Sequence, residues 1–122
     1  MKAGEIITAY AAILPLMDAD LNWQDSYEVL RLKKKLQAEA EIFSQQEKKL
    51  VDRLADRDEH GKIIIDENGR FKITGENIKT FTDERQKMID VSVLWDSKKI
   101  RIHTDKVKPA IIEALDKFIE FI

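Results

Sequence analysis

An apolar heptad in the first half of this 122-residue chain limits the folds that are open to it. Its members recur every seven residues: Val29, Leu36, Phe43 and Leu50. A sustained heptad predicts one long helix, over about residues 23–55, with a single seam buried against other helices. At 1.5 Å per residue the helix would be roughly 45–50 Å long, more than a compact domain of this size needs. Part of it should therefore project, or pack against another copy or a partner, although Glu47 interrupts the seam.

Shorter amphipathic segments predict three further helices. The first covers about residues 4–17 and is bent near its end by Pro15, which lacks a backbone donor. Another covers about residues 76–89, where apolar side chains follow helical spacing. The last covers about residues 109–121, opens with Pro109 in its first turn and stays apolar to its end.

The acidic segment over residues 56–67 has two interpretations. As a calcium loop it places these residues at positions one, three, six, eight and twelve of an EF-hand: Asp56, Asp58, Gly61, Ile63 and Glu67. As a β-hairpin it forms strands over about residues 62–66 and 70–74 around the turn Asn68-Gly69. We favour the hairpin, because imidazole, here His60, is a poor calcium ligand. Whether the loop binds any cation is left open.

Alternating apolar residues predict a second strand pair over about residues 91–95 and 99–103. Periodicity does not decide whether these strands pair with each other or join the 62–74 hairpin. The fold class that results is α+β and mainly helical. It has antiparallel helices, one of them long, a β-hairpin inserted between helices, a second short strand pair and a C-terminal helix, all in one domain over residues 1–122.

Residues suited to catalysis are sparse in the sequence. His60 and His103 have no partner at a spacing typical of a metal site or a triad, and the chain has no cysteine. Its four glycines do not form a phosphate-binding loop. We therefore predict no catalytic, cofactor-binding or metal-binding residue, no small-molecule ligand and no enzymatic activity.

Basic residues cluster on the long helix at Arg31, Lys33, Lys34 and Lys35. They could form a strip that contacts phosphates, or a solvated face paired with nearby glutamates. We favour the solvated face, because the net charge is −2 and no aromatic residues interleave with the cluster. The N-terminus lacks the pattern of a signal peptide, and no apolar run is long enough to span a bilayer. These features predict a cytoplasmic protein without a membrane partner.

Several short phrases are spread over most of the chain. In order they are Ile13-Leu14-Pro15-Leu16, Asp20-Leu21 with Tyr27, Lys33-Lys34-Lys35-Leu36, Asp58-Glu59-His60-Gly61, Asp66-Glu67-Asn68-Gly69, Asp90-Val91, Ile100-Arg101-Ile102, and Pro109 with Leu115 and Lys117-Phe118-Ile119. In layout they resemble an uncharacterised family of small phage and prophage proteins, a domain of unknown function. The resemblance implies a phage or prophage origin, in the bacterial host cytoplasm or on the virion, and no catalytic residues. The stretch Trp95-Asp96-Ser97 is longer than this layout leads us to expect.

The leading hypothesis is a non-enzymatic interaction, assembly or accessory protein. The long helix and the apolar C-terminal helix would contact a protein partner or further copies of the chain. A second hypothesis is a holding chaperone, because the helix, hairpin, helix order resembles prefoldin. A third is a nucleic-acid-binding regulator, whose salt-sensitive binding would weaken on replacement of Lys33, Lys34 and Lys35.

Overall fold

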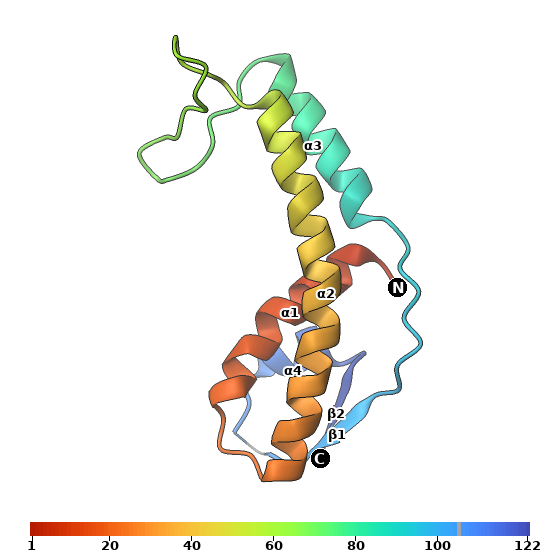
Figure 1. Ribbon diagram of the computed structural model, residues 1–122. Helices are drawn as coiled ribbons and strands as arrows, with labels where there is room; N and C mark the ends of the chain where they lie inside the picture. The colour runs from red at the N-terminus through yellow and green to blue at the C-terminus, as the bar shows by residue number, and fades with distance from the viewer. Residues whose placement is uncertain (105) are drawn as a thin grey trace.

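The long helix predicted from the heptad forms the axis of the molecule (Figure 1). A computed structural model describes residues 1–104 and 106–122. Helix α2 (Trp23–Leu54) spans 32 residues, which corresponds to about 48 Å at 1.5 Å per residue. It starts where the side chain of Asn22 accepts a 2.8 Å hydrogen bond from the backbone N–H of Asp25. It ends at Ala55, whose backbone is extended.

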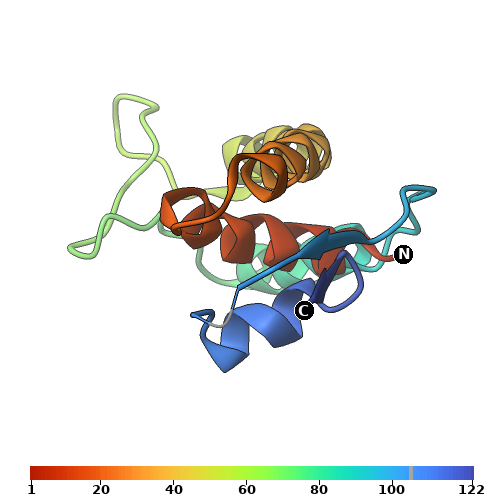
Figure 2. The same cartoon turned by 90° about the horizontal axis from the view of Figure 1, so that it is seen from below.

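The N-terminal half of α2 belongs to a well-packed layer of elements. Helix α1 (Ala3–Ile13) and the 3₁₀ turn η1 (Leu14–Asp18) run back along it, and Pro15 lies in that tighter turn. Helix α4 (Pro109–Leu115) covers the other side of α1, as the view in Figure 2 shows. The shared core consists of buried side chains from these elements: Ile6, Ala9, Ile13, Leu16, Val29, Leu32, Leu36, Ile102, Leu115, Phe118 and Ile119. We call this half of the molecule the proximal half.

The C-terminal half of α2 packs against a different helix. Helix α3 (Glu76–Ile89) packs beside it, and residues 55–75 connect the two helices as an extended arm (Figure 1). All residues of α3 are described, and none of them is buried. The α2–α3 pair and its arm therefore form a thinly packed distal half.

The hairpin predicted over residues 62–74 does not form as a two-stranded ladder. Its turn is present and brings Ile65 opposite Phe71, but this pair is an isolated antiparallel bridge. The reason is a ring of three backbone hydrogen bonds that joins three residues, each eight positions after the one before. Asp56 N–H donates to Lys72 C=O (2.8 Å), Ile64 N–H to Asp56 C=O (2.9 Å), and Lys72 N–H to Ile64 C=O (3.0 Å). Three segments thus share the bonds that two strands would have exchanged.

The second predicted strand pair is also wrong, because its two segments pair elsewhere. Residues 91–93 lie antiparallel to the N-terminus, where Ala3 N–H donates to Val91 C=O at 2.9 Å and Ser92 bridges Lys2. Strand β1 (Ile100–Ile102) instead pairs in parallel with β2 (Ile119–Phe121).

Strand β2 lies in the segment predicted as helix up to residue 121. Helix α4 ends at Leu115, and the chain turns back so that Ile119 becomes 2% exposed in the core beside the completely buried Ile102. The β-branched and aromatic residues at the end of the chain suit this extended pairing.

Candidate interaction surfaces

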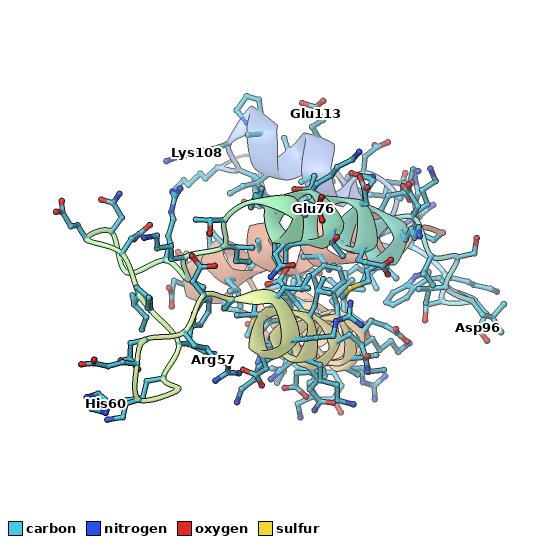
Figure 3. All side chains as sticks on the ribbon, turned by 90° about the horizontal axis from the view of Figure 1, so that it is seen from above. Arg57, His60, Glu76, Asp96, Lys108 and Glu113 are labelled. Carbon is cyan, nitrogen blue, oxygen red and sulfur yellow. The ribbon has the colours of Figure 1, made fainter. Side chains whose placement is uncertain are left out.

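The two histidines occupy unrelated places. His60 lies at the tip of the arm, with its ring exposed and 3.6 Å from the Glu59 carboxylate (Figure 3). His103 follows β1 and meets Asp25, a buried carboxylate in the first turn of α2. The backbone N–H of His103 donates to Asp25 Oδ2 at 2.8 Å, and its Nδ1 lies 3.3 Å from the same oxygen. The contact joins β1 to the start of α2, and sequence reasoning missed it because the residues are 78 positions apart.

The carboxylates of the acidic segment fold the arm's own turns. Asp58 and Asp66 each accept two backbone N–H groups at 2.8–3.0 Å through one oxygen. Each turn closes on a glycine with positive φ, Gly61 at 77° and Gly69 at 75°. Asp56 Oδ2 accepts the hydroxyl of Thr74 at 2.7 Å. Over residues 1–104 and 106–122, no three His, Cys, Asp or Glu side chains gather in a way that could hold a metal ion.

The first candidate surface is an open groove of about 880 Å³ in the distal half. We call it the distal groove, and its apolar lining comes from α2, the arm and α3: Val51, Phe71, Ile73, Ile78 and Phe81. Phe71 and Ile78 are 51% and 46% exposed. An apolar surface left open to water in this way is typical of an interaction site.

A partly exposed ion pair joins the two helices at this groove. Arg85 Nε on α3 lies 2.7 Å from Glu47 Oε2 on α2, and its guanidinium sits 5.7 Å from the ring centre of Phe43. Glu47 therefore interrupts the heptad where α2 meets α3. The pair fixes the position of α3 along α2, because charge-assisted hydrogen bonds depend strongly on geometry.

A second hollow, beside the C-terminal end of α3, also exposes apolar groups. Ile42 is 56% exposed, and it lies with Phe43 and Met88 around a shallow hollow of about 150 Å³. Val91 and Val93, from the connection after α3, complete the lining. Apolar side chains are thus exposed both at the distal groove and beside the end of α3.

The second candidate surface lies in the proximal half, where two basic segments converge. Arg31 and Lys35 of α2 face Lys98, Lys99 and Arg101 across a hollow of about 440 Å³. Lys35 Nζ donates to Ser97 Oγ at 2.9 Å and so ties α2 to the connection before β1.

The structure divides the basic cluster that the sequence suggested. Lys33 and Lys35 point to nearly opposite sides of α2, since successive helical residues rotate by about 100°. No aromatic residue lies within the cluster, but one contacts it from the preceding turn of α2. The ring of Tyr27 lies one turn before Arg31, with the guanidinium carbon 4.6 Å from the ring centre and a 3.2 Å hydrogen bond to the hydroxyl.

No known protein family, curated protein or solved structure matches the chain. Among the described residues, none of the helices is both long enough and apolar enough to cross a bilayer.

Proposed function

We propose that the chain is a non-enzymatic interaction protein that assembles with a second copy of itself through the distal half. One observation carries the proposal: α3 is an amphipathic helix of 14 residues without a single buried residue. Isolated helices of this length are marginal in water and depend on packing of their apolar face. A partner that covers the distal groove would supply that packing.

The charges of α3 support a second copy as the partner. A two-fold interface brings one surface against itself, so a surface that carries both signs can pair its own charges. The polar positions of α3 are mixed in this way: Lys79 and Asp83, together with Glu84 and Lys87, which lie 3.4 Å apart within the helix. Two α2–α3 pairs packed face to face would form a four-helix arrangement.

We extend the proposal to the origin of the protein, and this part rests on the sequence resemblance alone. In this view the assembled protein is a structural or accessory component of a phage or prophage, in the host cytoplasm or on the virion. Assembly through helices is favoured over a prefoldin-like arrangement. A chaperone of that kind would join through hairpins, whereas the arm directs the backbone bonds of Asp56, Ile64 and Lys72 to one another.

The mass of the protein in solution, measured by light scattering on a size-exclusion column over a range of concentrations, tests the proposal. We expect a dimer or larger assembly. Phe81→Asp should shift it to monomer, because the substitution places a charge in the distal groove. Thr80→Asp, on the same helix and exposed, is the matched control and should leave the mass unchanged. A wild-type monomer at every concentration would overturn self-assembly.

A further inference from the structure

We propose that the proximal half carries a second site, which binds single-stranded nucleic acid. The site consists of Trp23, Tyr27, Arg31 and Lys35 on α2 with Lys98 and Lys99 before β1; we call it the basic–aromatic face. It is separate from the distal groove, so it extends the proposed function and does not depend on it.

Charge is the first part of the argument. Five cationic side chains line the hollow, against one carboxylate, Glu28. Arg101 is neutralised by Glu120, with Nε 3.1 Å from Oε2. The remaining four are concentrated in a chain whose net charge is −2, so the positive potential is a local feature of the fold. Asp96 belongs to the same connection but does not line the hollow, and it lies at the outer end of the connection in Figure 3.

Exposed aromatic rings are the second part. Trp23 and Tyr27 are 74% and 51% exposed, and they lie one turn apart on α2. The same four-residue spacing continues through Arg31 and Lys35, so rings and cations follow one stripe of the helix. The other tryptophan, Trp95, is instead packed edge-on against Phe118 at 5.3 Å. Trp23 therefore contributes little to the core, and its ring is open to a ligand.

Together the rings and cations favour single strands over other anions. Unstacked bases lie on aromatic faces and on guanidinium planes, while lysines follow the phosphates. Tyr27 and Arg31 already form such a stacked pair, at 4.6 Å. Duplex DNA keeps its bases stacked inside, and an acidic protein has no bases for the rings to stack on.

Fluorescence anisotropy of a labelled oligothymidylate, from about 50 to about 200 mM salt, tests the charge argument. We expect binding that weakens with salt. The double substitution Lys98→Gln and Lys99→Gln should reduce the affinity about tenfold. It should also reduce the slope of log affinity against log salt by about 1.4, because each cation lost contributes roughly 0.7. The control is the double substitution Lys48→Gln and Lys49→Gln, at an exposed pair on the distal part of α2, which removes the same charge. It should change the affinity and the salt slope much less.

Aromatic substitutions test the choice of ligand. Trp23→Ala and Tyr27→Ala should each weaken single-strand binding about tenfold and leave weak duplex binding unchanged. Both side chains are exposed, so circular dichroism should confirm an intact fold. No binding at the lowest salt, or equal losses in the two lysine pairs, would overturn the proposal. So would equal affinity for duplex, for polyglutamate as an acidic-protein mimic, or for inorganic phosphate at matched ionic strength.

Discussion

Asp25 forms hydrogen bonds through one side chain to two residues that are distant from each other in the sequence. It occupies the third helical position of α2, where Asn22 Oδ1 accepts its N–H at 2.8 Å and Asn22 Nδ2 lies 3.3 Å from its carboxylate. This exchange is a variant of the capping box. The same carboxylate also accepts the backbone N–H of His103, which only the folded structure reveals.

Removal of this carboxylate should destabilise the protein. Asp25→Ala leaves the backbone donor of His103 unpaired in a half-buried setting, and we expect the free energy of unfolding to fall by about 2 kcal/mol. Asp25→Asn keeps an acceptor of the same shape and should cost less. Urea denaturation measures both, with Asp52→Ala at an exposed site of α2 as the control. A loss in the control as large as in Asp25→Ala would contradict a specific role for this contact.

At the scale of elements, the helices were predicted correctly where local periodicity determines them. The heptad located α2, and helical spacing located α1 and α3, because apolar faces of helices are visible in short windows. The strands depended on distant partners. Residues 91–93 pair with the N-terminus and β1 pairs with β2, and no window that contains one segment reveals the other. Turn residues at Gly61 and Gly69 were informative, but the three-way bonding of the arm was not encoded in either turn alone.

The candidate surfaces were predicted only in part for the same reason. The long helix suggested a contacting seam, whereas the distal groove requires α2, α3 and the arm together. The convergence of Arg31 and Lys35 with Lys98 and Lys99 links segments more than 60 residues apart, as the Lys35–Ser97 bond at a separation of 62 shows. Sequence spacing could have found the Tyr27–Arg31 pair, because the two residues are four positions apart.

The end of the chain offers a test of strand against helix. On a helix, Ile119 and Ile122 would be three residues apart on one face and would be buried together. In β2, Ile119 is 2% exposed, whereas Ile122, just beyond the strand, is 59% exposed. Ile119→Ala should therefore lower the free energy of unfolding by about 2–4 kcal/mol, and Ile122→Ala by less than about 0.5 kcal/mol. Similar losses from both substitutions, measured by urea denaturation, would instead favour a continuous helix.

At the scale of the whole molecule, stability is unevenly distributed along α2. Its N-terminal half contributes Val29, Leu32 and Leu36 to the main core. Its C-terminal half buries Leu50, Val51 and Leu54, yet faces a helix with no buried residue of its own. Regions with few buried apolar contacts open locally at low cost. One helix thus connects a well-packed half to a thinly packed half.

If the distal half assembles as proposed, its protection from hydrogen exchange should depend on protein concentration. Association stabilises only the conformation that binds, so amides of α3 should exchange hydrogen more slowly as the concentration rises through the assembly range. Amides of α1 and of residues 29–36 should exchange at a constant slow rate, because the proximal core is complete within one chain. Hydrogen exchange read by mass spectrometry at two concentrations resolves these segments. Phe81→Asp should abolish the concentration dependence in α3, and Thr80→Asp should preserve it. Slow exchange of α3 at every concentration would show that α2 alone is enough to hold it, and the distal groove would then have no need of a second copy.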